Sequence, residues 1–175
     1  MTLEQLLAAA ALKDVARAGW VRAGVPAPES VAAHTWGVAW LVLAIAPPSL
    51  DRARALTYAL LHDLAEARVG DLTPHDGVSR EEKHRREAEA IEVLLAGRPD
   101  LQAAWADYER RADAEARFVH QLDRLDMALQ ADRYAEATGL DLREFLRSAD
   151  AAITEPVLRR LMDDLLARQL SRAAN

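Results

Sequence analysis

An adjacent histidine and aspartate, His62 and Asp63, are the residues of this chain best suited to chemistry. A neutral imidazole and a carboxylate give a mixed nitrogen and oxygen grip on a divalent metal ion. Neighbours on a helix point about 100° apart, so both reach one ion only if it lies beside the helix, in a cleft. Glu66 follows on the same helical face, where a carboxyl group can move a proton of a reacting water. The pair predicts a hydrolytic metal site if other residues complete it.

Two further segments carry suitable ligands. His34 lies just inside a helix predicted from Pro28, and Asp123 lies within another predicted helix. Together with His62 and Asp63 they supply two imidazoles and two carboxylates and no thiolate, a set that suits Mn, Co, Fe, Ni, Zn or Mg. Four protein ligands leave positions on an octahedral ion open for water and substrate, which a hydrolase needs and a structural site does not.

The order of these segments resembles the HD-domain metal-dependent phosphohydrolases, and specifically their 5′-deoxynucleotidase branch. That branch includes the bacterial 5′-deoxynucleotidases and their eukaryotic HD domain-containing relatives. A lone His-Asp dipeptide occurs by chance, but an ordered set of segments in register is a specific signal. The resemblance covers most of the chain and is carried by Arg17–Val21, Pro28–Val31, His34, His62–Glu66, Val69–Asp71, Glu81–Glu87 and Gln121–Asp123.

The resemblance implies a single divalent metal ion, whose identity stays open, and a set of site residues around it. Asp126, one turn beyond Asp123, competes for the ligand role, but the Gln121–Asp123 motif favours Asp123 and leaves Asp126 as an outer or surface group. The implied metal ligands are His34, His62, Asp63 and Asp123.

The same resemblance implies catalytic carboxylates at Glu66 and Asp71, without deciding which one is the base. It also implies that Arg17 and Trp20 contact the phosphate and the sugar of a substrate. Elementary chemistry agrees in kind, because a guanidinium matches phosphate oxygens and an indole offers a flat wall. We leave His75, His84 and His120 as solvent-facing residues or as groups behind the site.

The implied reaction is hydrolysis of a deoxyribonucleoside 5′-monophosphate to a deoxynucleoside and phosphate. Two departures concern the sugar: Ala33 stands where the bacterial enzymes often have an acidic residue, and Ala18 and Gly19 separate Arg17 from Trp20, as in the eukaryotic-type members. The alternatives are an HD phosphohydrolase with another nucleotide substrate and a non-catalytic module that binds a nucleotide or a protein partner. The intact Glu66 and Asp71 argue against the module.

Composition fits one domain that contains residues 1–175. Hydrophobic residues make up 51%, there is no cysteine, and the formal net charge of −6 argues against nucleic acid polymers as partners. The N-terminus lacks a basic region before its apolar residues, and the longest apolar stretch, residues 38–48, is shorter than the roughly 20 residues of a membrane span. These features predict a cytoplasmic protein that does not enter membranes, and the resemblance implies a small-molecule nucleotide as substrate.

Alanine and leucine dominate while β-branched and aromatic residues are sparse, which predicts an all-α fold: a single compact HD domain of roughly six to eight helices. The final helix carries an apolar stripe at Leu158, Leu161, Leu165 and Leu166 that either joins the core or docks a second subunit, and the resemblance suggests a homodimer. The predicted helices span residues 2–18, 28–46, 51–68, 79–96, 101–111, 113–138, 142–148 and 155–171.

Overall fold

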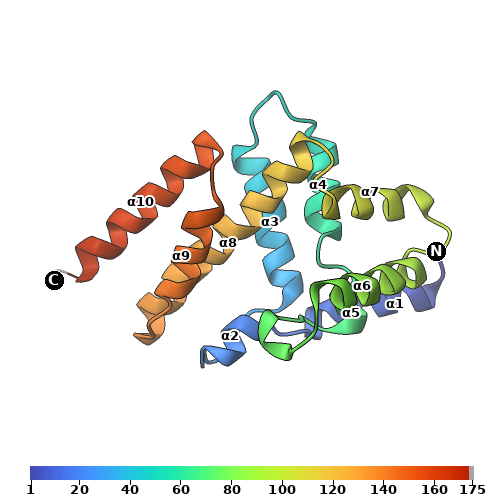
Figure 1. Cartoon of the computed structure of the whole chain (residues 1–175), viewed down its shortest axis with the longest axis horizontal. Coiled ribbons are helices and arrows are strands. Elements are labelled where there is room, and N and C mark those ends of the chain that lie inside the picture. The colour runs from blue at the N-terminus through green and yellow to red at the C-terminus, as the bar shows by residue number, and fades with distance from the viewer. Residues whose placement is uncertain (174–175) are drawn as a thin grey trace.

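The computed structural model describes residues 1–173, and these residues form an all-helical domain (Figure 1). Eight helices have eight residues or more, as predicted, and α2 and α5 add one turn each. The described residues contain no strand, only an isolated antiparallel bridge between Ala16 and Ser30. The helices are α1 (Leu3–Ala10), α2 (Ala18–Arg22), α3 (Val31–Ile45), α4 (Arg52–Leu61), α5 (Glu66–Val69), α6 (Arg80–Leu94), α7 (Pro99–Glu109), α8 (Ala114–Thr138), α9 (Arg143–Ala152) and α10 (Pro156–Ala173).

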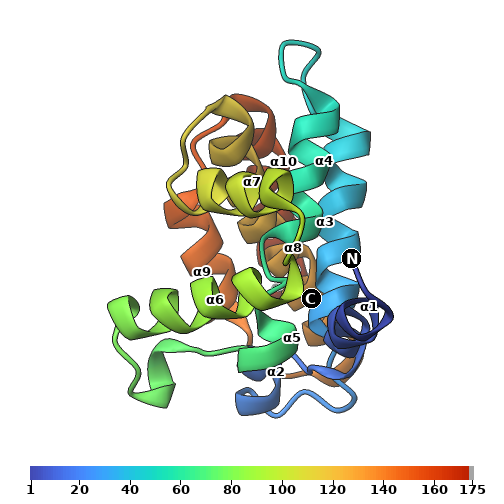
Figure 2. The same cartoon turned by 90° about the vertical axis from the view of Figure 1, so that its right-hand side faces the viewer.

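The long helix α8 is the centre of the fold, because α3, α4, α9 and α10 all pack against it. Leu122 and Leu125 of α8 are fully buried, and Val38 and Val42 of α3 join them in the main core. A smaller core around Trp105 joins α6 and α7, and α1, α5 and α6 pack together beside the main bundle (Figures 1 and 2). The segments that carry the predicted metal ligands therefore come from the packed centre of the fold, while α5 and α6 lie beside it.

Polar side chains and one glycine set the ends of the helices that carry the site. Ser30, Asp51 and Asp113 each accept a hydrogen bond from a backbone N–H of the first turn of the helix that follows, as N-cap residues do. Gly139, with φ 75°, ends α8 in the left-handed conformation that glycine adopts without steric cost. These local signals explain why the sequence predicts the core helices well.

The helix predicted over residues 51–68 is wrong in one respect, because it breaks at the His-Asp pair. Helix α4 ends at Leu61 and α5 begins at Glu66. Between them the backbone tightens to hydrogen bonds three residues apart, from Leu64 N to Leu61 O (3.1 Å) and from Glu66 N to Asp63 O (3.0 Å). The break places His62 and Asp63 on a tight turn rather than in the middle of a helix.

The predicted ends of the first two helices are also wrong. Helix α1 stops at Ala10, a 3₁₀ turn follows, and the chain then runs extended beside residues 29–31. Arg17 N donates to Glu29 O at 3.0 Å, and Val31 N donates to Val15 O at 2.8 Å. This pairing draws Pro28 and Glu29 out of the helix, so that α3 starts only at Val31.

Two smaller predictions also need correction. Helix α7 begins at Pro99, two residues before its predicted start, because proline suits the first turn of a helix. Helix α9 continues to Ala152, beyond its predicted end.

Most of the apolar stripe of the final helix, α10, packs into the main core. Leu158 and Leu165 are buried in the main cluster and Leu166 packs against it, while Leu161 stays partly exposed. In the described part of the chain, no helix combines the length and the apolar character needed to cross a membrane.

Candidate metal centre and substrate cavity

The four predicted metal ligands come together at one point. His34 comes from α3, His62 and Asp63 from the turn after α4, and Asp123 from α8. The Nε2 atoms of the two histidines lie 3.3 Å apart, and Asp123 Oδ1 lies 3.2 Å from His34 Nε2. Asp63 Oδ2 lies 3.1 Å from His62 Nε2 and 3.7 Å from His34 Nε2. Ligand atoms of His34, His62 and Asp123 all fall within 4.8 Å of one another.

These spacings fit a divalent ion. Donor atoms about 2.1 Å from a common ion lie about 3 Å apart when they occupy adjacent positions. The observed separations of 3.1 to 3.7 Å between neighbouring donors match that spacing. Two imidazole nitrogens and two carboxylate oxygens also form a suitable donor set. The residues present therefore fit one ion of the kind that the sequence predicts.

Both imidazoles are held so that Nε2 faces the centre. His62 Nδ1 donates to the carbonyl oxygen of Ala59 at 2.8 Å. His34 Nδ1 lies 2.7 Å from Asp126 Oδ2. Asp126 therefore contacts the outer side of the His34 ring, which matches its predicted place as an outer group. Such outer contacts fix the tautomer and orientation of a ligating histidine.

Gly37 makes room for this outer contact. A Cβ atom at position 37 would lie 2.2 Å from Asp126 Oδ1, far inside van der Waals contact. A glycine in the middle of a helix is otherwise unfavourable by about 1 kcal/mol relative to alanine. We infer that the glycine allows α8 and its carboxylate to approach α3 closely.

Strong electrostatic coupling marks the centre. Burial and Arg17 lower the pKa of His34, but hydrogen bonds with Asp123 and Asp126 outweigh them and raise it to about 9. Burial raises the pKa of Asp63, yet His62 and Arg17 more than compensate and hold it below its usual range. In the absence of an ion, the imidazoles and carboxylates thus stabilise one another through shared protons.

Glu66, predicted to be catalytic, lies beside this centre in an unusual state. Its side chain is buried, with the residue 3% exposed, and its Oε2 atom has no hydrogen-bond partner. Burial, followed by the nearby charges of Asp63 and Asp71, raises the pKa of Glu66 to about 10. A buried carboxyl group that keeps its proton at neutral pH is a feature of sites that transfer protons.

Arg17 and Asp71 form the edge of the site. Arg17 Nη1 lies 3.4 Å from Asp63 Oδ2 and 3.8 Å from Asp71 Oδ2. Asp71 Oδ2 also accepts the backbone N–H of Ala18 at 2.8 Å. Burial lowers the pKa of Arg17, but Asp63, Asp123 and Asp71 raise it further, so the guanidinium stays charged. Asp71 therefore ties the Arg17 segment to the loop that follows α5.

Trp20 lines the cavity from within the core. It is 2% exposed, and its rings lie 4.2 Å from the Phe145 ring and 5.5 Å from the Tyr134 ring, measured between centroids. Its indole N–H donates to Glu29 Oε1 at 3.0 Å. Little of the indole faces the cavity, so its predicted contact with the sugar stays a prediction.

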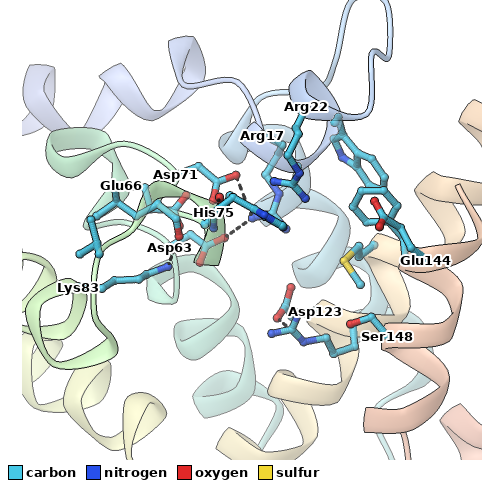
Figure 3. A pocket seen from close by; sticks show the side chains of 18 of the residues that line it. Arg17, Arg22, Asp63, Glu66, Asp71, His75, Lys83, Asp123, Glu144 and Ser148 are labelled. Atoms are coloured by element: carbon cyan, nitrogen blue, oxygen red, sulfur yellow. Dashed lines mark hydrogen bonds and ion pairs between the residues drawn. The ribbon is translucent and has the colours of Figure 1, made fainter.

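The metal centre opens into a cavity of about 840 Å³ (Figure 3). Arg17, Asp63, Glu66, Asp71 and Asp123 all line it. Residues that the sequence reasoning did not single out also contribute. The most relevant are Lys83 of α6, and Glu144, Phe145 and Ser148 of α9.

Lys83 could have been found from the sequence, because it lies in a segment that carries the family resemblance. The charged run 81–87 is also typical of a solvated helix face, and for that reason Lys83 was not predicted to line the site. Lys83 Nζ lies 3.3 Å from Glu87 Oε1 and donates to the carbonyl oxygen of Leu72 at 3.0 Å. No comparable signal marks Glu144 or Ser148, which reach the cavity only through the packing of α9 on α8.

The three remaining histidines lie outside the ligand set. His75 is exposed on the loop that borders the cavity. His84 stacks on Trp105, with 5.7 Å between ring centroids. His120 lies 2.9 Å, through Nε2, from Arg111 Nη2.

Comparison with known proteins shows to which family the chain is related. Residues 9–161 match the family model described as HD domain. The 5′-deoxynucleotidase HDDC2 of Bos taurus is 39% identical over 165 residues, which cover 90% of this chain and 80% of the relative. The 5′-deoxynucleotidase hdd1 of Schizosaccharomyces pombe is 36% identical, covering 89% of this chain and 83% of the relative.

A solved structure is also similar to this chain in sequence and in fold. A conserved hypothetical protein from Pyrococcus furiosus superposes with a TM-score of 0.82 at 30% identity, covering 95% of this chain and 99% of that one. The match extends over most of the sequence and over the helices that carry the ligands, and it confirms the resemblance predicted from the motifs. This chain belongs to the HD domain family.

Proposed function

We propose that this chain is a metal-dependent phosphomonoesterase that hydrolyses deoxyribonucleoside 5′-monophosphates to deoxynucleoside and phosphate. The observation that carries the proposal is the convergence of His34, His62, Asp63 and Asp123 beside a buried carboxyl group, at the wall of an open cavity. The names of the 5′-deoxynucleotidase relatives support the substrate class.

His34, His62, Asp63 and Asp123 would hold one divalent ion. Bound there, the ion would polarise a phosphate oxygen and make water a stronger nucleophile at neutral pH. Its identity is not fixed by this donor set, because sites of imidazole and carboxylate ligands bind according to metal availability as much as intrinsic preference.

Arg17 is proposed to bind the phosphate. Its guanidinium lies at the edge of the metal centre and stays charged, and two parallel N–H donors match two phosphate oxygens. The hydrogen bond from Ala18 N to Asp71 holds the backbone next to Arg17, so the arginine is oriented before substrate arrives. The catalytic role predicted for Asp71 stays a prediction beside this positioning contact.

Glu66 is proposed to move the proton. Its free Oε2 and its raised pKa give a carboxyl group that can donate to the leaving 5′ oxygen of the nucleoside. The charges of the bound ion and of the substrate phosphate would then determine how readily the Glu66 carboxyl group releases its proton.

The proposal is tested by phosphate release from dAMP and AMP, using metal-stripped protein with Mn, Co or Mg added back. We expect metal-dependent release, faster from dAMP than from AMP, that is lost in His62→Ala. The matched control is His84→Ala, which removes an exposed imidazole that stacks on Trp105, away from the ligands.

Equal release from both monophosphates would remove the deoxyribose selectivity and keep the phosphatase. Release from other nucleotides alone would favour the alternative HD phosphohydrolase. Binding of dAMP without turnover under every metal condition would favour the non-catalytic module.

We also propose that the protein forms a homodimer through α3. Trp36, Trp40 and Leu43 follow one helix face and are 68%, 54% and 51% exposed. Exposed apolar stripes of this kind often mark contacts between subunits. Sedimentation of the wild type as a monomer at micromolar concentration would contradict the proposal. Dissociation by Trp40→Glu would support it.

A further inference from the structure

The cavity continues beyond the metal centre to a second end formed by α9. Glu144 and Ser148 lie four residues apart on this helix, so their side chains project from one face, and both line the cavity. Figure 3 places both across the view from Glu66 and Lys83. This end is therefore distinct from the wall that carries the proton-transfer group.

Apolar side chains accompany the two polar ones. Met127 and Phe145 line the same cavity, and the largely buried Trp20 supports the Phe145 ring with 4.2 Å between ring centroids. Gly19 lets α2 come close to this group, because a Cβ there would lie 3.3 Å from Phe145 Cε1. Binding sites for small aromatic ligands combine such an apolar surface with a few polar groups that fix orientation.

The polar groups at this end are free to bind a ligand. Within residues 1–173, neither the Glu144 carboxylate nor the Ser148 hydroxyl has a hydrogen-bond or ion-pair partner. Two other charged residues of α9 differ in this respect, since Arg143 pairs with Asp141 and Asp150 pairs with Arg159. An ionised carboxylate accepts hydrogen bonds, donates none, and repels phosphate. The Glu144 carboxylate therefore favours a part of the substrate that carries N–H donors at the α9 end.

We propose that the α9 end is a nucleobase subsite and that Glu144 gives the enzyme a base preference. This inference rests on the proposed function, which places the phosphate at the metal centre and leaves the base at the far end of the nucleotide. A carboxylate fits the adjacent N1–H and N2–H donors of guanine, whereas thymine offers one N–H between two carbonyl oxygens. Ser148, which both donates and accepts, supplies a second hydrogen bond.

The test compares kcat/KM for dGMP, dTMP and the base-free ester 2-deoxyribose 5-phosphate, using the metal-loaded protein. We expect dGMP to exceed dTMP by about tenfold, the lower part of the range for one good pair of base contacts. In Glu144→Gln the amide offers both a donor and an acceptor, so the ratio should fall to about twofold or less. The matched control is Glu92→Gln, an exposed residue of α6 outside the cavity lining, which should keep the wild-type ratio.

The outcomes separate this inference from the proposed function. Equal kcat/KM for dGMP and dTMP in the wild type, or a ratio unchanged by Glu144→Gln, overturns the base subsite and leaves the phosphatase intact. Failure of the wild type to release phosphate from any of the three esters overturns the proposed function instead. Calorimetric Kd values for dGMP and dTMP, measured in Glu66→Gln with and without Glu144→Gln so that little substrate is consumed, then test the subsite by binding; equal changes in both Kd values would overturn it.

Discussion

Replacement of Gly37 by alanine should weaken metal binding although residue 37 touches no metal. The new Cβ would lie 2.2 Å from Asp126 Oδ1 and 2.9 Å from Asp126 Cγ. The oxygen must withdraw by roughly 1 Å to reach ordinary van der Waals separation. Asp126 Oδ2 is 2.7 Å from His34 Nδ1, so this movement breaks the contact that orients the ligand.

The magnitude follows from two opposing effects. Alanine gains about 1 kcal/mol of helix propensity over glycine, which favours the fold. Loss of an outer contact to a metal ligand typically costs about 10- to 100-fold in metal affinity. We therefore expect the Kd for Mn²⁺ to rise by about that factor.

The assay is titration of metal-free protein with Mn²⁺ by calorimetry, in four variants beside the wild type. Gly37→Ala is compared with Asp126→Ala and with the double variant, because coupled residues give non-additive effects. Ala44→Gly, an exposed position on the same helix, is the control for helix propensity. Wild-type metal affinity in Gly37→Ala, or losses that simply add in the double variant, would refute the reasoning.

Four further outcomes are expected. Glu66→Gln should lower kcat by about 10²- to 10⁴-fold while Mn²⁺ still binds, because it removes the transferable proton; near-normal turnover would exclude that role. Arg17→Lys should lower kcat/KM for dAMP by about tenfold or more, because an ammonium cannot replace the bidentate guanidinium, and an unchanged value would place the phosphate elsewhere. Lys83→Met should lower kcat/KM by about tenfold, because the ammonium that fixes the loop at the cavity wall is lost; Lys13→Met, an exposed lysine outside the cavity, is the control. Mn²⁺ at about 100 times its Kd should raise the thermal midpoint by about 5–10 °C through linkage, and His34→Ala should lose most of that shift; an equal shift in the variant would argue against this centre.

The helices of the core and the residue types of the site could be predicted from the amino-acid sequence. Apolar residues that recur every three or four positions, N-cap side chains and helix-ending glycines act over a few residues, so they can be recognised without the fold. His34, His62, Asp63 and Asp123 were identified because a metal site requires particular residue types and the family places them in a fixed order. Their convergence in the structure follows from the packing of α3 and α4 on α8.

Features that depend on contacts between distant segments could be recognised only in the folded structure. The helix break at His62 could not be predicted, because the residues of Ala55–Leu61 and of Leu64–Arg68 both favour helix. Only the tertiary packing around the site separates the two segments. The outer contact of Asp126 and the space at Gly37 depend on how closely α8 approaches α3. Glu144 reaches the cavity through the packing of α9 against α8, and no local pattern in the sequence predicts that arrangement.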